Sequence, residues 1–328
     1  MKKNIILLGL ILFAGTSCSN DEIKDVKPAE VIDFRAAVDT RASETTTEVL
    51  DNFMVTAFDS SNEIYFSGVN FVKYGDSFKA EGEVYYYWPA DKKLTFYAYA
   101  PTDLGEAVTI DQTKKKLTGY TPAADLRQQK DIIAVVQEEE YSPSGTTLEF
   151  EHILSQIEIV GKNNNKGYTY HIGGIIIGNI VSSGDYDFST GQWERGNETA
   201  TYSITNTYDI PLNNETGLKS LMLINDKVET AMLIPQQLTA YNPDTNTGGA
   251  YLSVYVRVVT SGGTQVFPET DNYGLVSVGI DTLWEPGIKY IYTLDFTTGE
   301  SILGEPFKFQ VESISRWTDS ESIEKPEV

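Results

Sequence analysis

The amino-acid sequence predicts an all-β protein made of two β-sandwich domains in tandem, and three features of the chain support this prediction. Residues 84–101 hold two alternating runs rich in aromatic residues, 84–88 and 94–100, separated by the polar turn residues 89–92, which is the pattern of a β-hairpin. Short apolar runs with a period of two recur at a spacing of about ten residues, as in β-sandwiches. No segment shows a sustained helical periodicity.

Length and charge limit the classes of function. The chain has 328 residues, enough for two domains of ordinary size, and 25 basic against 47 acidic residues give it a net charge of −22. Such an acidic surface repels phosphate backbones, so we expect no nucleic-acid partner. The single cysteine, Cys18, excludes a disulfide within the chain, and the fold must therefore depend on its hydrophobic cores.

The N-terminus predicts export. Residues 1–17 combine a short basic start with the apolar run 5–14, which is too short to span a bilayer and is typical of a signal peptide. Small residues precede Cys18 and resemble a bacterial lipobox, in which the cysteine is diacylated and anchors the mature chain to a membrane. A plain signal peptide with an incidental cysteine is the alternative. Residues 18–29 are polar and predict a flexible tether, and their serine and acidic residues resemble the surface-export signal of Bacteroides-type lipoproteins.

The mature chain begins with a short strand. Ile32, Phe34, Ala36 and Val38 alternate within residues 31–38 and predict one buried face. The polar stretch 39–48 follows and predicts an exposed loop.

Strand and turn patterns continue to the C-terminus. Residues 123–130 could start a helix, but 131–136 are β-branched and predict a strand. Residues 184–187 predict a turn. The polar stretch 161–167 is the best candidate for a domain boundary, which gives domains at 30–163 and 164–328.

No catalytic chemistry is visible in the sequence. The two histidines, His152 and His171, lie in strand-like runs, where a structural role is the more common one. The chain lacks GxSxG, HExxH, CxxC and P-loop motifs. We therefore expect a protein that is not an enzyme and that needs no cofactor and no metal.

Several short motifs follow one another along the chain: Thr40-Arg41-Ala42, Tyr87-Trp88-Pro89, Phe96 to Pro101, Lys130-Asp131-Ile132, Phe150 to Ile157, Met232 to Gln237, Trp284 to Gly287, Tyr290-Ile291-Tyr292 and a terminal strand ending at Trp317. Taken in order, these motifs resemble those of the Mfa-like fimbrillins, which are pilin and pilin-related lipoproteins of Bacteroides-type bacteria. They span residues 32–317, nearly the whole mature chain. The resemblance implies two tandem transthyretin-like β-sandwich domains and a lipid-anchored precursor of a fimbrial (pilus) subunit, located at the outer membrane, on the cell surface and in the fimbrium.

The resemblance also implies a mechanism of assembly. An Arg-specific protease would cut between Arg41 and Ala42 and release the first strand, with its alternating residues Ile32, Phe34, Ala36 and Val38. A C-terminal strand from a neighbouring fimbrial subunit would then fill the groove. Phe307, Phe309 and Val311 alternate in the way that such a donor strand requires. Arg35 is an alternative cut site, but it lies inside the predicted strand.

Other readings of the same residues stay open. In one alternative, residues 39–48 are only a loop and residues 305–317 are the last strand of the second domain. The acidic tail after Trp317 shows no alternation, so no separate donor strand would remain. The chain would then be a tip or accessory subunit, or a non-polymerising surface lipoprotein that binds a glycan, a protein, or a host or bacterial receptor through exposed Tyr and Trp residues. Finally, Asp281-Thr282-Leu283 matches a short O-glycosylation pattern of such bacteria, which makes Thr282 a candidate site.

Overall fold

The computed structural model describes residues 30–38, 46–82, 84–225, 227–242, 245, 248–270 and 272–297, and the backbone of residues 310–316. These residues form β-strands joined by turns and by two short 3-10 helices, η1 (Thr102–Ala107) and η2 (Leu126–Gln128). The prediction of an all-β protein is confirmed.

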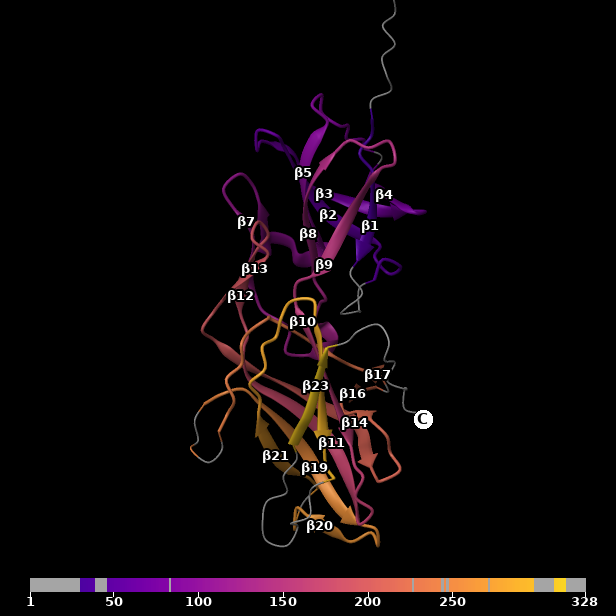
Figure 1. Ribbon diagram of the computed structural model, residues 1–328, viewed down its shortest axis with the longest axis vertical. Helices are drawn as coiled ribbons and strands as arrows, with labels where there is room; N and C mark the ends of the chain where they lie inside the picture. The colour runs from indigo at the N-terminus through magenta and orange to yellow at the C-terminus, as the bar shows by residue number, and fades with distance from the viewer. Residues whose placement is uncertain are drawn as a thin grey trace, which may run out of the picture. The chain divides into compact units, whose positions relative to one another are not determined.

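Seven strands from the N-terminal part of the chain form a closed barrel (Figure 1). Its interior is rich in phenylalanine because alternate residues of each strand point inward, among them Phe53, Phe71, Phe96 and Phe150. Around the barrel the strands follow the order β1 (Phe34–Val38), β4 (Ser77–Ala80), β3 (Ile64–Tyr74), β2 (Asn52–Asp59), β5 (Lys93–Ala100), β8 (Ile133–Glu140) and β9 (Thr146–His152).

Two further sheets enclose a second core of aliphatic and tyrosine side chains. One sheet has the order β15 (Lys219–Ser220), β10 (Ser155–Lys162), β22 (Lys289–Asp295) and β23 (Gln310–Arg316), and β18 (Ala231–Leu233) also pairs with β10. The other has the order β14 (Thr199–Leu212), β11 (Tyr168–Val181), β19 (Tyr251–Thr260) and β20 (Gln265–Phe267), and β21 (Gly274–Gly279) also pairs with β19.

A small sheet draws its strands from both parts of the chain. Its order is β13 (Gln192–Arg195), β12 (Gly184–Asp187), β7 (Lys115–Tyr120) and β6 (Val108–Ile110). Its Leu117 and Tyr186 pack in a third cluster with Ile153, Leu154 and Ile234. A separate pair is formed by β16 (Leu223–Ile224) and β17 (Lys227–Val228).

The predicted hairpin at 84–101 is wrong in its pairing. The turn forms, since Lys92 donates its backbone N–H to the carbonyl of Pro89 (2.9 Å), and Phe96, Ala98 and Ala100 are buried as the alternation predicts. However, β5 has β2 and β8 as its neighbours, so no edge is left for residues 84–88. That segment instead meets the N-terminal segment through a bridge between Val31 and Tyr87.

Residues 184–187 form strand β12 and not only a turn, because they find pairing partners in β7 and β13. The chain passes from the barrel to the next sheet at Ile153–Leu154, earlier than the polar stretch 161–167, since β10 already pairs with β18 and β22. Residues 131–136 lead into β8, as the strand prediction requires.

Candidate functional site

The first strand fills the barrel with three buried side chains. Ile32, Phe34 and Val38 are 2%, 1% and 6% exposed, and Ala36 is partly buried against the same core. The ring of Phe34 lies among other phenylalanines, with its centroid 4.7 Å from that of Phe71 and 5.0 Å from that of Phe96. The alternation seen in the sequence is therefore the alternation of the fold.

The backbone of β1 lies between two strands of unequal contact (Figure 1). Five residue pairs join β1 to β9 in parallel, from Phe34 with Thr146 to Val38 with Phe150. On its other side β1 meets β4 in the single pair of Phe34 with Phe78. Without β1, a groove between β4 and β9 would expose the pockets of its buried side chains.

Residues 84–88 hold the start of this strand. The backbone N–H of Ile32 donates to the carbonyl of Tyr86 (2.7 Å), and the Tyr65 hydroxyl donates to the carbonyl of Tyr87 (2.7 Å). The sequence pattern does not reveal this role, because it predicts a hairpin between residues 84–88 and the strand that forms β5. The chain pattern shows which residues alternate, but not which strand they meet.

The predicted cleavage residues, Arg41 and Ala42, lie outside the described residues, as does the lipidation residue Cys18. Directly before them, Val38 donates its backbone N–H to Thr47 Oγ1 (3.0 Å). The alternative cut residue, Arg35, is exposed, but its backbone is paired with Thr147 of β9.

The candidate donor strand is described only in part. Val311 belongs to β23 and pairs with Leu294 of β22, at the end of the order of their sheet. Phe307 and Phe309 lie outside the described residues. Thr282, the predicted glycosylation residue, has its hydroxyl oxygen buried in the fold, so a glycan on that oxygen would require the surrounding residues to move.

The two histidines lie in polar clusters with separate surroundings. His152 Nδ1 is 2.8 Å from Asp131 Oδ1, and the two side chains are 1% and 4% exposed, so no substrate reaches them. His171 lies 3.0 Å from Asp209, which also holds Arg257 at 2.7 Å. Burial, together with the charge of Arg257, lowers the pKa of His171.

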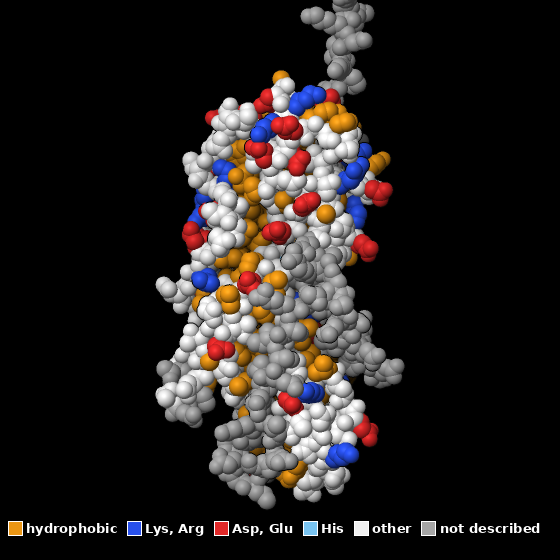
Figure 2. Space-filling model, viewed as in Figure 1, with side chains coloured by type: hydrophobic (Ala, Val, Ile, Leu, Met, Phe, Trp, Pro, Cys, Tyr) orange, Lys and Arg blue, Asp and Glu red, His pale blue; other side chains and the backbone are white. Residues whose placement is uncertain are grey.

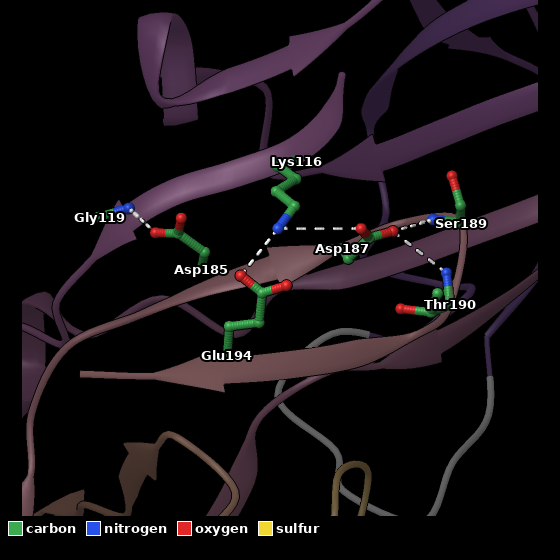
Figure 3. A network of polar contacts seen from close by, with 7 residues as sticks. All are labelled: Lys116, Gly119, Asp185, Asp187, Ser189, Thr190 and Glu194. Carbon is green, nitrogen blue, oxygen red and sulfur yellow. Dashed lines mark hydrogen bonds and ion pairs between the residues drawn. The ribbon is translucent and has the colours of Figure 1, made fainter. Parts of the chain in front are cut away.

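Each carboxylate of a charged network on the small sheet has partners within the fold (Figure 3). Asp187 accepts the N–H groups of Ser189 and Thr190 and shapes the turn after β12. Lys116 lies 2.8 Å from Glu194 and 4.0 Å from Asp187, which brings β7, β12 and β13 together. Asp185 accepts the backbone N–H of Gly119 (2.7 Å), so each carboxylate of the network supports the pairing or the turns of these strands.

The described residues contain neither a cluster of metal ligands nor a helix that could span a membrane. No group of three or more His, Cys, Asp or Glu side chains among the described residues is arranged to hold a metal ion. Within the same part of the chain, none of the helices has the length and hydropathy needed to cross a bilayer.

Comparison with known proteins gives a family profile and several similar folds. The profile described as fimbrillin-like matches residues 40–313. A fimbrial protein from Bacteroides vulgatus is 17% identical, with a TM-score of 0.64 over 88% of this chain and 99% of that chain. A candidate cell adhesion protein from Bacteroides ovatus is 15% identical, with a TM-score of 0.52 over 89% and 99% of the two chains.

A third solved structure, a candidate cell adhesion protein from Bacteroides uniformis, is 15% identical, with a TM-score of 0.50 over 88% of this chain and 99% of that chain. At these identities the similarity is one of fold. None of the curated proteins compared with the chain matches it.

Proposed function

The chain belongs to the fimbrillin-like family, and from this premise we propose that it is a structural and adhesive fimbrial subunit that assembles by donor-strand exchange. In this proposal the chain is not an enzyme. It is exported as a lipoprotein precursor, reaches the cell surface and the fimbrium, and has other fimbrial subunits as its partners. We keep two transthyretin-like parts in this proposal, but their boundary then lies at residues 153–154 and not at the predicted 163/164, because β10 already pairs with β18 and β22.

The burial of the first strand is the observation that supports this proposal most. Ile32, Phe34 and Val38 lie in the barrel core, and the strand that carries them has only one residue pair with β4. Cleavage between Arg41 and Ala42 would free this strand from the rest of the chain. A strand from another subunit can then replace it, because its backbone pairs with β9 and its alternate side chains enter the vacated pockets.

The lipid anchor and the donor strand complete the proposed cycle. Cys18 would hold the precursor on the outer membrane through its acyl chains until cleavage releases the mature subunit. Residues 305–317, with Phe307, Phe309 and Val311, would supply the donor strand. The position of β23 at the edge of its sheet supports this role, since leaving an edge breaks pairing on one side only.

The same strand also supports the second candidate, a tip or accessory subunit. Val311 is paired with Leu294 of its own chain. A subunit that keeps β23 in its own sheet can accept a donor strand without supplying one.

A surface lipoprotein that binds a glycan or another receptor is supported less well. Exposed aromatic side chains are present, including Tyr65, Tyr85 and Tyr87, and Figure 2 shows hydrophobic side chains between acidic ones on one face. A cavity of about 160 Å³ beside Tyr97 and Lys93 is lined mainly by polar and charged residues. Ligand sites usually have volumes of about 300–1,000 Å³, so this cavity is small for a glycan.

Limited digestion with an Arg-specific protease tests the proposal. Mass spectrometry should find cleavage after Arg41, and Arg41→Ala should abolish it, whereas Arg35→Ala should still be cut. Size-exclusion chromatography of the cut protein should show a ladder of oligomers, and Phe309→Asp should remove that ladder.

The other results separate the alternatives. Cleavage at Arg41 without oligomers would identify a tip or accessory subunit. A chain that resists the protease, or that is only trimmed at its ends, would contradict processing and would favour a receptor-binding lipoprotein.

A further inference from the structure

The barrel has a seam between β8 and β9. These two strands share the backbone pairs Ile133–His152 and Ala134–Glu151, both at one end. Beyond that end β8 continues to pair with β5 as far as Glu140, while β9 turns to pair with β1. A cavity of about 320 Å³ lies at the seam, with Val136, Glu149 and Tyr186 among its lining residues.

The side chain of Gln137 bridges this seam. Its Nε2 donates to the carbonyl oxygen of Thr147 (2.9 Å), and its Oε1 accepts the backbone N–H of Glu149 (3.2 Å). One amide thus offers β9 a donor and an acceptor, as the backbone of a neighbouring strand would. Glu139 Oε1 accepts a second hydrogen bond from the same Nε2 (2.6 Å), which fixes the direction of the amide.

The position of Gln137 in the sequence is itself unusual. Ile133 and Val135 occupy the core-facing positions of β8, and Gln137 is the next residue in that alternation. Its partner on β5 is Phe96, whose ring packs against Phe34 of β1. A polar residue at a core-facing position costs stability unless it is hydrogen-bonded, and here its bonds go to β9.

The bridge matters most when β1 is absent. Residues 146–150 of β9 make their five strand pairs with β1, and their backbone contact across the seam is made by Gln137. Once β1 leaves, β9 keeps two pairs with β8 at its far end and the two hydrogen bonds of Gln137. Without this side chain, one wall of the empty groove would be held at a single end.

We propose that Gln137 is a positioning residue for strand exchange, which keeps β9 in place while the groove of β1 is empty and so prepares it for the incoming strand. This proposal rests on the proposed exchange of β1. Gln137 acts through the backbone of β9 and does not touch the donor. Gln137 affects affinity because only chains with β9 in place can bind an incoming strand. The apparent affinity is the intrinsic affinity multiplied by the fraction of emptied chains in which β9 is in place.

The test uses the full chain, cut within residues 39–45 and freed of its first strand, and a fluorescent synthetic peptide of residues 30–38 as the probe. Gln137→Ala should weaken peptide binding about tenfold, because two hydrogen bonds no longer order β9 in the empty chain. Glu138→Ala is the matched control, since Glu138 lies on the same strand but bonds outward to Lys93 (2.7 Å). It should bind the peptide like the wild type.

Hydrogen exchange at the Glu149 amide gives a second readout that needs no peptide. In the emptied chain, Gln137→Ala should exchange this amide at least about tenfold faster than the wild type and Glu138→Ala. If the wild-type chain fails to bind any strand peptide, the proposed exchange is wrong, and the amide readout still decides the role of Gln137. Equal exchange in all three emptied chains, or equal peptide affinity, would overturn that role.

Gln137→Glu separates positioning from a general loss of packing. A glutamate carboxylate accepts the Glu149 N–H but cannot donate to the Thr147 carbonyl, and it would be repelled by Glu139, whose Oε1 lies 2.6 Å from Nε2 in the wild type. The protonated acid can both accept and donate, and it removes this repulsion. Peptide binding by Gln137→Glu should therefore recover as the pH falls through the pKa of that carboxyl. The wild type should not gain affinity over the same range.

Discussion

Strands β1 and β10 occupy similar places in their sheets but differ in how firmly they are held. Each pairs in parallel with a later strand, β1 with β9 over five residue pairs and β10 with β22 over seven. Antiparallel neighbours give β1 one pair, whereas β10 gains three from β18 and two from β15. Both faces of β10 are buried, while Arg35 and Ala37 of β1 are exposed.

The difference shows how one chain can contain a replaceable strand and a permanent one. β10 contributes Ile157 and Ile159 to its core and buries Glu158 against Lys289 (2.8 Å), so its removal would expose both apolar and charged groups. β1 contributes a single row of apolar side chains, which any strand with the same alternation can supply. Core burial alone therefore does not make a strand permanent.

The largest effect is expected from Phe34→Ala, which should lower the free energy of unfolding of the barrel by about 3–5 kcal/mol because a fully buried ring is removed. Arg35→Ala, on the exposed side of the same strand, should stay within about 0.5 kcal/mol. Urea unfolding followed by tryptophan fluorescence measures both.

A peptide of residues 30–38 sharpens this comparison. Added in excess, it should displace the truncated strand of Phe34→Ala from the groove and restore part of the lost stability, because it binds the folded barrel and not the unfolded chain. It should not help Ile159→Ala in β10, whose loss should be about 2–5 kcal/mol. Equal rescue of both variants would contradict the distinction between the two strands.

An intermediate effect is expected from alkaline pH, because the barrel core is built from phenylalanine and the second core contains tyrosine. Burial raises the pKa of Tyr202 to about 12, and that of Tyr292 likewise to about 12. Since an unfolded tyrosine has a pKa of about 10, the stabilisation by the neutral hydroxyls is complete below pH 10 and is lost as the pH rises towards 12. The loss should reach about 2 kcal/mol for each tyrosine.

Tyr202→Phe checks this prediction in urea titrations at pH 9 and pH 11.5. Its unfolding free energy should fall less between the two pH values than that of the wild type, by about 2 kcal/mol. Tyr85→Phe, at an exposed position, serves as the control. If both variants follow the wild type, buried tyrosines do not limit the second core.

The smallest effect is expected where the chain passes from the barrel strand β9 to β10 of the next sheet. Trp193 donates its indole N–H to the carbonyl of Ile153 (2.7 Å), directly between β9 and β10. Trp193→Phe should cost about 1 kcal/mol, because the bond is lost and part of the ring area remains. A larger loss of unfolding free energy than that of Phe34→Ala in the same urea experiment would show that the Trp193 hydrogen bond contributes more to stability than the Phe34 ring.

The sequence predicted faces of strands better than partners of strands. Ile32, Phe34 and Val38 are buried as their alternation requires, and so are Phe96 and Ala98, because the period of two is a property of each strand alone. Pairing depends on distant segments, which the local pattern does not contain.

For this reason residues 84–88 meet the segment before β1 and not β5, and residues 184–187 become a strand through β7. The polar stretch 161–167 was a visible turn signal, but it follows a strand that already pairs with β22. Gln137 left a trace in the sequence as a polar residue in a core-facing row. Its partners, Thr147 and Glu149, required the fold.

The direction of β1 has a thermodynamic consequence for any polymer built on its groove. β1 runs parallel to β9, and parallel pairs are slightly less stable per residue than antiparallel ones. A strand entering in the opposite direction would pair antiparallel with β9 over the long contact and parallel with β4 over the single-residue contact. In backbone pairing alone, the chain's own strand is then the less stable of the two occupants that the groove admits. Once cleavage has removed β1, a donor in the opposite direction would gain more from its pairing with β9 than β1 did.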